Sequence, residues 1–200
     1  PTYSGVINIA GITTLKFFGV DSAGNEEAVK TETYTIDETV PAGTIEINGG
    51  AEYTNSTAVS LGLSATDNEG VSGMQFSNDG VVWTAEEAYG VTKAWDLTSG
   101  DGTKTAYVRY KDGAGNWSGE YSDTIILDTA APVTAAAPAG GLYNAAQVVT
   151  LTSSEAATIY YTVDGTEPTT ASPVYTTPIN IISTTTLKYF GVDSAGNEEA

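Results

Sequence analysis

Apolar and polar residues alternate along short stretches of the chain, which is the pattern of β-strands with one buried face. Val59, Leu61 and Leu63 are separated by Ser60 and Gly62, and similar runs recur along the sequence. Asp-Gly turns separate many of these runs. No window shows the sustained apolar spacing of an amphipathic helix, although residues 84–89 fit a single helical turn. The pattern predicts an all-β fold of antiparallel β-sandwiches, each with about seven strands.

The sequence also repeats itself. Residues 1–28 return as residues 173–200, an offset of 172, with 20 identities in 28 aligned positions. This period is too long for a solenoid unit and suits a pair of domains of roughly 90 residues each. Asp-x-Ala-Gly-Asn occurs three times, at 21–25, 112–116 and 193–197. We therefore expect one two-domain repeat followed by the start of the next.

Two strand-like runs end in an Asp and reach a Pro four residues later, from Asp37 to Pro41 and from Asp128 to Pro132. Proline has no backbone N–H and cannot continue a central strand, so pairing should stop there. We accordingly place domain boundaries near residues 38 and 131. The predicted segments are the back half of a domain at 1–38, a complete domain at 39–131, and a domain lacking its last strand at 132–200.

Composition then excludes several functions. The chain has 25 acidic and 7 basic residues, a net charge of −18, and neither His nor Cys. These absences exclude a Ser–His–Asp triad, a Cys nucleophile, a disulfide framework and His- or Cys-ligated zinc. The charge argues against nucleic-acid partners and anionic membrane surfaces. No apolar stretch approaches the roughly 18–20 residues that span a bilayer, so we expect no membrane insertion.

The C-terminal segment carries a recognisable combination of motifs. Residues 158–199 contain Y-x-x-D-G-x-x-P-T, Y-x-x-P-I-x-I, T-T-L-K and a closing D-x-A-G-N. This combination resembles the chitobiase/β-hexosaminidase C-terminal type of bacterial immunoglobulin-like module, over 132–200 and as a partial copy over 1–38. Segment 39–131 is similar to another bacterial immunoglobulin-like repeat, on residues 64–83 and 110–116. The resemblance implies tandem immunoglobulin-like β-sandwiches in a large exported prokaryotic protein, without catalytic residues.

The first residue of the D-x-A-G-N turns is a candidate metal ligand. This Asp either only closes its turn by accepting backbone N–H groups, or also binds Ca²⁺, which takes six to eight oxygen ligands. A turn Asp beside a junction Asp would place two carboxylates at a domain hinge. The calcium hypothesis therefore assigns Asp37 and Asp128 as ligands, with Asp21 and Asp112 as helpers.

Aromatic residues give a second candidate site. Trp83 and Trp117 each follow a turn, and exposed aromatic faces can stack on sugar rings. The two residues are therefore candidates for carbohydrate binding, and packing at the rim of the core is the alternative. Trp95 is expected to be the core tryptophan. The adjacent glutamates at 26–27, 86–87 and 198–199 face opposite sides of a strand and cannot converge on a glycosidic bond.

These observations favour a non-catalytic repeat segment of a large exported surface protein. It would act as a stalk, spacer, or extracellular fibre or adhesin, outside the cell or on the surface of a prokaryote. The expected partners are other copies of itself or neighbouring immunoglobulin-like domains, head to tail. Two hypotheses remain for the incomplete domains at the two ends. In the first, residues 29–37 of one copy supply the missing strand of the 132–200 domain of the next copy. In the second, the sequence is an arbitrary piece of a longer continuous array. The alternative function is a carbohydrate-binding accessory module of a secreted glycan-active enzyme, with glycans as partners.

Overall fold

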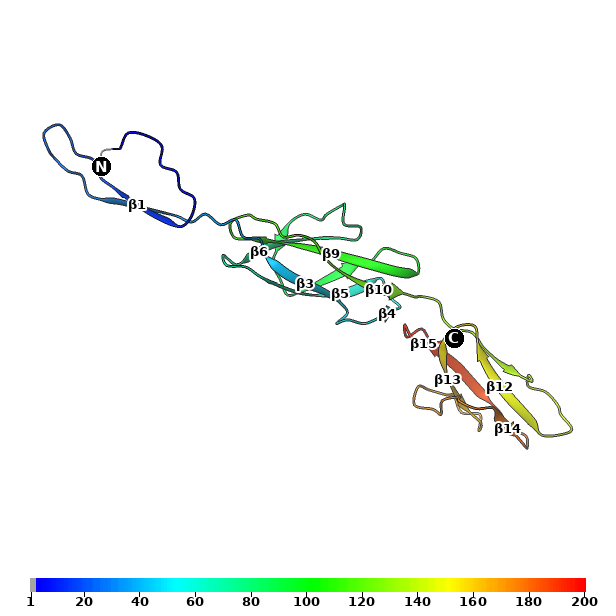
Figure 1. Ribbon diagram of the computed structural model, residues 1–200. Coiled ribbons are helices and arrows are strands. Elements are labelled where there is room, and N and C mark those ends of the chain that lie inside the picture. The colour runs from blue at the N-terminus through cyan, green and yellow to red at the C-terminus, as the bar shows by residue number, and fades with distance from the viewer. Residues whose placement is uncertain (1–2) are drawn as a thin grey trace.

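The computed structural model describes residues 3–200, so the first two residues of the 1–38 segment lie outside it (Figure 1). The described residues form strands, turns and irregular segments, and the all-β prediction is confirmed. The helical turn expected at residues 84–89 does not form. Those residues instead lead into the two-residue strand β7 (Glu87–Ala88), which pairs with its neighbour at Gly73 and Met74. No helix in the described range could cross a membrane.

The N-terminal segment is a two-stranded hairpin. Strand β1 (Thr13–Phe17) pairs antiparallel with β2 (Lys30–Tyr34), with Leu15 opposite Glu32. Every residue of β2 is exposed, and no side chain between residues 3 and 40 is buried. The apolar residues of this hairpin therefore have no packed core around them.

The central segment is a two-layer sandwich. One sheet contains β3 (Ala42–Ile47), β5 (Ala58–Thr66) and β8 (Thr92–Asp96). The other has the order β4 (Tyr53–Thr54), β10 (Tyr121–Leu127), β9 (Gly102–Asp112), β6 (Val71–Ser77), β7. Strand β4 runs parallel to β10, because the chain leaves the first sheet after β3 and joins the edge of the second. The sandwich is therefore antiparallel except at this edge.

The predicted alternation accounts for the core of this sandwich. Val59, Leu61 and Leu63 of β5 point inward with exposures of 6%, 0% and 6%. They form one cluster with buried residues of the opposite sheet, including Phe76. Trp95, the expected core tryptophan, is half-buried against this cluster with its ring 5.6 Å from that of Phe76.

The C-terminal segment is a smaller sandwich with five strands rather than about seven. One sheet contains β11 (Thr134–Ala137), β12 (Gln147–Ser153) and β14 (Ile179–Ile181), and the other contains β13 (Ala157–Thr162) and β15 (Lys188–Asp193). Its core is a separate cluster of four buried residues: Val149, Leu151, Ile159 and Ile179.

The three groups of strands follow one another along the chain, joined by single segments (Figure 1). The expected boundaries, near 38 and 131, fall between these groups. Pro41 and Pro132, which follow the junction aspartates, are each less than 2% exposed. Each junction segment is therefore fixed at its C-terminal end by a proline inserted into the module that follows.

We predict that the two sandwiches respond separately to core mutations. Leu61→Ala should lower the free energy of unfolding of the central sandwich by about 2–5 kcal/mol, because it removes buried methyl groups and leaves a cavity. All three tryptophans lie between residues 83 and 117, so tryptophan fluorescence during urea unfolding follows this sandwich alone. The matched variant Leu151→Ala should leave the tryptophan-detected transition unchanged. A shift of that transition by Leu151→Ala would contradict the separation of the two cores.

Candidate metal centres at the module junctions

Each D-x-A-G-N sequence folds into the same hydrogen-bonded turn. In the central module, the Asp112 N–H donates to the Asn116 carbonyl at 3.1 Å, and the Asn116 N–H donates to Asp112 Oδ1 at 2.8 Å. Asn116 Nδ2 donates to the other carboxylate oxygen at 2.8 Å. The turns at 193–197 and 21–25 make the same three bonds. The fourth residue, Gly115 here, has a φ of 105°, a conformation that other residues rarely adopt.

The asparagine of this turn also contacts the junction segment. Asn116 Nδ2 donates to the main-chain carbonyl of Asp37 at 2.9 Å, and Asn197 Nδ2 donates to that of Asp128 at 2.8 Å. The junction Asp makes its own short turn in both places, since Asp37 Oδ1 accepts the Thr39 N–H at 3.0 Å. The junction aspartate therefore lies against the D-x-A-G-N turn of the module that follows it.

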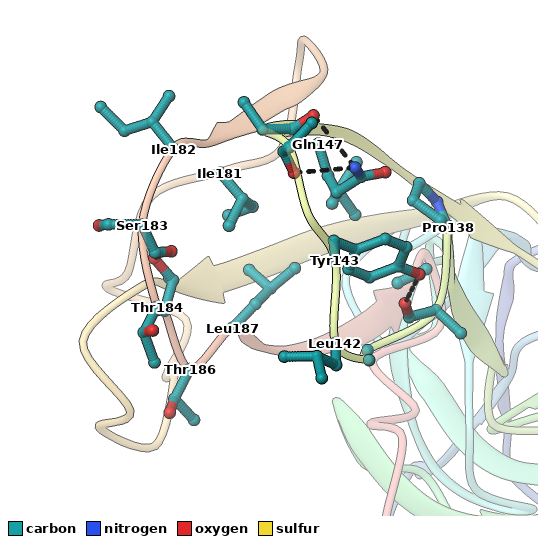
Figure 2. Close-up of a pocket in the computed structure, with 18 of the residues that line it drawn as sticks. Pro138, Leu142, Tyr143, Gln147, Ile181, Ile182, Ser183, Thr184, Thr186 and Leu187 are labelled. Atoms are coloured by element: carbon teal, nitrogen blue, oxygen red, sulfur yellow. Dashed lines mark hydrogen bonds between the residues drawn. The ribbon is translucent and has the colours of Figure 1, made fainter.

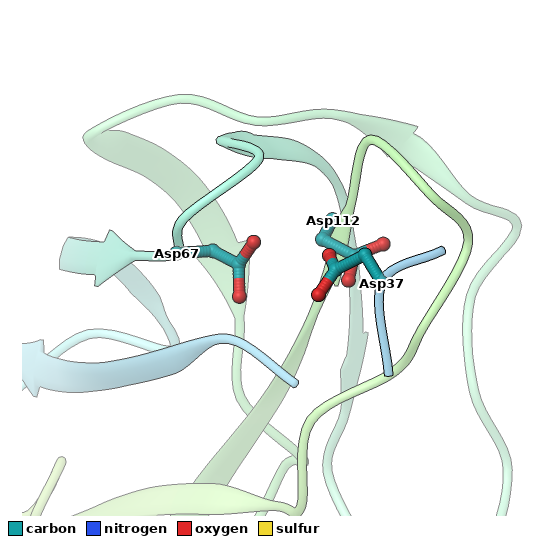
Figure 3. Close-up of side chains that lie close together, drawn as sticks. All are labelled: Asp37, Asp67 and Asp112. Carbon is teal, nitrogen blue, oxygen red and sulfur yellow. The ribbon is translucent and has the colours of Figure 1, made fainter. Parts of the chain in front are cut away.

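This arrangement brings three carboxylates together at the first junction. Asp37, Asp67 and Asp112 each have an oxygen within 4.8 Å of the others (Figure 3). Asp67 comes from the turn after β5, and Asp112 ends β9 and is 1% exposed. Asp37 Oδ2 and Asp67 Oδ2 are buried and have no hydrogen-bond partner. Two carboxylate oxygens at this site are thus removed from water without a protein donor.

A second cluster of the same design lies at the next junction. Asp128, Glu155 and Asp193 have oxygens within 4.8 Å of one another. Glu155 occupies the turn after β12, the place that Asp67 takes after β5. Burial of its carboxyl group, and the negative charges of Asp128 and Asp193, raise the pKa of Glu155. Two modules of different sequence therefore build the same three-carboxylate arrangement.

The turn aspartates are held in the charged form. Burial acts to raise the pKa of Asp112, but hydrogen bonds from the side chain and backbone of Asn116 outweigh it and lower the pKa. The same balance, with Asn197 as donor, lowers the pKa of Asp193. The four ion pairs among residues 3–200 all join Lys to Glu outside these clusters. A divalent cation would supply the positive charge that the clusters lack, and carboxylate oxygens suit Ca²⁺.

The structure changes the grouping of the sequence-based ligands. Asp37 meets Asp112, the turn residue of the following module, and Asp128 meets Asp193 in the same way. Asp21 lies in neither cluster, and its carboxylate contacts only its own turn, at Ala23 and Asn25. It was expected to help because it precedes Asp37 in the sequence. The correct partner lies 75 residues further along the chain, at Asp112.

Asp67 and Glu155 were missed by the sequence analysis. They differ in residue type, and each lies about 40 residues from the turn Asp that it joins. A usable signal exists, because each is an acidic residue in the first turn after the second long strand of its module.

Trp83 and Trp117, the candidate carbohydrate-binding residues, lie on either side of one side chain. The Arg109 guanidinium carbon is 4.6 Å from the centre of the Trp83 ring and 4.9 Å from that of Trp117. Arg109 also donates through Nε and Nη2 to Gln75 Oε1, at 3.0 and 2.7 Å. Both indoles are half-buried. One face of each ring is therefore occupied by the arginine, which limits the aromatic surface left for a sugar.

Two hollows lie in the C-terminal module. One, of about 780 Å³, lies between the 138–147 loop and residues 181–187, and none of its lining side chains is charged (Figure 2). Residues 185–189 are the counterpart of β1 in the repeat, and β1 pairs with β2 in the N-terminal segment. The hollow thus lies beside an edge where the repeat carries a further strand.

Another hollow, of about 730 Å³, contains several carboxylates, among them Glu167, Glu198 and Glu199. Glu167 forms an ion pair with Lys188. Glu199 accepts the Thr134 N–H at 2.7 Å and so joins β11 to β15. Two of these three carboxylates therefore already have partners within the module.

Comparison with known proteins supports the assignment of the C-terminal module. Residues 138–200 match the family model described as "Chitobiase/beta-hexosaminidase C-terminal domain". The C-terminal module resembles this family, as its motifs predicted. A comparison with curated proteins gives no match.

Two solved structures align with the chain. The fibronectin(III)-like modules of Clostridium thermocellum CbhA share 11% identity, with 78% of this chain and 90% of that chain covered and a TM-score of 0.47. A tetra-tandem repeat from the extending region of a large adhesion protein shares 16% identity with a TM-score of 0.33. That alignment covers 94% of this chain and about half, 54%, of the other.

We predict that Arg109 stabilises the central module through both indoles. Arg109→Gln should lower its free energy of unfolding by about 1 kcal/mol, since a cation over an aromatic ring contributes roughly 0.5–2 kcal/mol. It should also change the tryptophan emission of the folded protein, because two of three indoles lose a contact. Lys104→Gln is the matched control, as Lys104 contacts the Ser99 carbonyl and no aromatic ring. Equal effects of the two variants would contradict this role.

Proposed function

We propose that the chain is a non-catalytic spacer segment in a tandem array of immunoglobulin-like modules, with module junctions fixed by calcium. The array would extend a large exported protein from the surface of a prokaryotic cell, as a stalk, fibre or adhesin. The observation that carries the proposal is the recurrence of one three-carboxylate cluster at both junctions. A ligand bound there would touch the junction segment and the following module together, and so limit bending between modules.

Burial and charge favour a cation at these positions. Carboxylate groups lose hydration on burial and are stable there only when hydrogen-bonded, paired or bound to metal. At the first junction Asp37 Oδ2 and Asp67 Oδ2 have none of the protein partners that would compensate. Extracellular calcium modules bind in the range of about 10⁻⁴–10⁻³ M, which suits a site of three carboxylates completed by water and carbonyl oxygens.

The adjacent glutamates support a non-catalytic role. Glu86 pairs with Lys111 at 2.9 Å, whereas Glu87 pairs with Lys93 at 2.6 Å on the other sheet. The two carboxylates thus diverge and are neutralised by different lysines. A glycosidase needs two carboxyl groups facing one bond, with one of raised pKa. Glu155, whose pKa is raised, lies in the junction cluster beside two charged aspartates instead.

Calcium titration of the metal-free chain tests the proposal. We expect two ions per chain by calorimetry, with Asp37→Asn and Asp128→Asn each abolishing one of them. Asp21→Asn is the control and should leave both, because Asp21 lies in neither cluster. Calcium at a hundredfold excess over its Kd should stabilise a module that binds it by about 2.7 kcal/mol. No binding heat, together with an unchanged Tm in millimolar calcium, would overturn the metal part of the proposal.

The alternative function is carbohydrate binding by the central module. It is favoured by the position of Trp83 and Trp117, which flank Arg109 and are only half-buried. Arg109 and Gln75 could hydrogen-bond to hydroxyl groups beside the two indoles, and Lys111 Nζ also lies 5.6 Å from the centre of the Trp117 ring. The same side chains would then both stabilise the sheet and present a polar, aromatic surface.

Affinity electrophoresis in gels that contain soluble polysaccharides separates the two functions. If the module binds glycans, the wild-type chain should be retarded and Trp83→Ala and Trp117→Ala should migrate freely. Val81→Ala is the control, since Val81 is 78% exposed and lies near Trp83 in sequence. Equal mobility of wild type and variants in all gels would contradict carbohydrate binding by Trp83 and Trp117.

A further inference from the structure

We infer that Asn116 and Asn197 are positioning residues for the junction cation sites. Each holds the junction aspartate by its main-chain carbonyl, so that the aspartate side chain faces the two carboxylates of the following module. The inference rests on the proposed calcium function, and it assigns to the last residue of the D-x-A-G-N turn a role between modules. The turn would then bind the segment that enters each module.

The side-chain amide is divided between two acceptors. A primary amide has two N–H donors. Asn116 Nδ2 reaches Asp112 Oδ2 at 2.8 Å and the Asp37 carbonyl at 2.9 Å. Asn197 repeats this with Asp193 Oδ2 at 2.7 Å and the Asp128 carbonyl at 2.8 Å. One side chain thus connects a candidate metal ligand of the module to the backbone of another ligand in the junction.

The contact holds the main chain of a residue whose other bonds are made by its side chain. The Asp37 carboxylate contacts Thr39 in its own segment and Asn68 Nδ2 at 3.2 Å. The amide of Asn116 holds the peptide group of Asp37 itself and so limits rotation of the segment before any cation binds. Groups that orient a metal ligand in this way typically change metal affinity 10–100-fold when they are removed.

The third turn provides an internal control. Asn25 donates its N–H to Asp21 Oδ1 at 2.9 Å and its Nδ2 to Asp21 Oδ2 at 2.7 Å, as the other two asparagines do in their turns. It makes no contact with a junction segment among residues 3–200. Asn25→Ala therefore removes the turn bonds alone, whereas Asn116→Ala and Asn197→Ala remove the turn bonds and the junction bond.

Two measurements on the full chain test the inference. In calcium titrations, Asn116→Ala should weaken binding at the first junction at least tenfold and leave the second unchanged, and Asn197→Ala should do the reverse. Asn25→Ala should change neither. In the metal-free chain, hydrogen exchange at residues 38–40 should be faster in Asn116→Ala than in wild type or Asn25→Ala. Tryptophan fluorescence verifies that the central module of Asn116→Ala is folded, and far-ultraviolet circular dichroism verifies that Asn197→Ala and Asn25→Ala are folded. If Asn116→Ala does not fold, calcium titration of Asn197→Ala still tests the inference at the second junction.

The outcomes separate this inference from the calcium proposal. If wild type binds no calcium but hydrogen exchange at residues 38–40 is still faster in Asn116→Ala, the metal proposal fails. Asn116 then only holds the junction segment through the Asp37 carbonyl and positions no metal ligand. If wild type binds two ions and both asparagine variants bind them with unchanged affinity, the positioning role is wrong while the calcium function stands. Equal weakening of both sites by one variant would likewise contradict a local role.

Discussion

Three like charges at each junction are the constraint on which the arrangement of modules depends. Asp37, Asp67 and Asp112 come from the junction, from the β5–β6 turn and from the end of β9, and they meet within 4.8 Å without a lysine or arginine among them. Repulsion would separate these side chains in a flexible protein. They stay together because each carboxylate is part of a turn whose backbone is fixed by hydrogen bonds. The three carboxylates therefore stay together with no cationic side chain among them, and a bound cation would offset their charge.

The junction segment is fixed at both ends. At its start the aspartate carbonyl is held by the asparagine amide, and at its end a buried proline enters the following module. Only three residues separate Asp37 from Pro41, and the same number separate Asp128 from Pro132. So short a segment, with both ends held, has little freedom to rotate. The asparagine contact and the proline thus restrict the same few bonds, and a cation bound at the candidate site would act on how one module follows another.

Sequence analysis could find those parts of the site that are local in sequence. The D-x-A-G-N turn was recognisable because its Asp, Gly and Asn each have a backbone requirement within five residues. The alternation in β5 likewise identified Val59, Leu61 and Leu63 as core. The pairing of Asp37 with Asp112 depends on how the sandwich returns its last strands to the end where the chain enters, and no local pattern shows that. Arg109 between two tryptophans was missed for the same reason, since Trp83 approaches it from a separate loop.

The two modules form junctions of the same kind although their cores differ. At the position two residues before the turn Asp, the central module has the fully buried Tyr110, whose hydroxyl donates to the Thr44 carbonyl at 2.6 Å. The C-terminal module has Gly191 there, and an added Cβ would lie only 3.2 Å from Pro132. Pro41 and Pro132 are both less than 2% exposed, and the turn, the amide contact and the carboxylate cluster are the same at both junctions. The same junction contacts therefore form in two modules that differ at this core position.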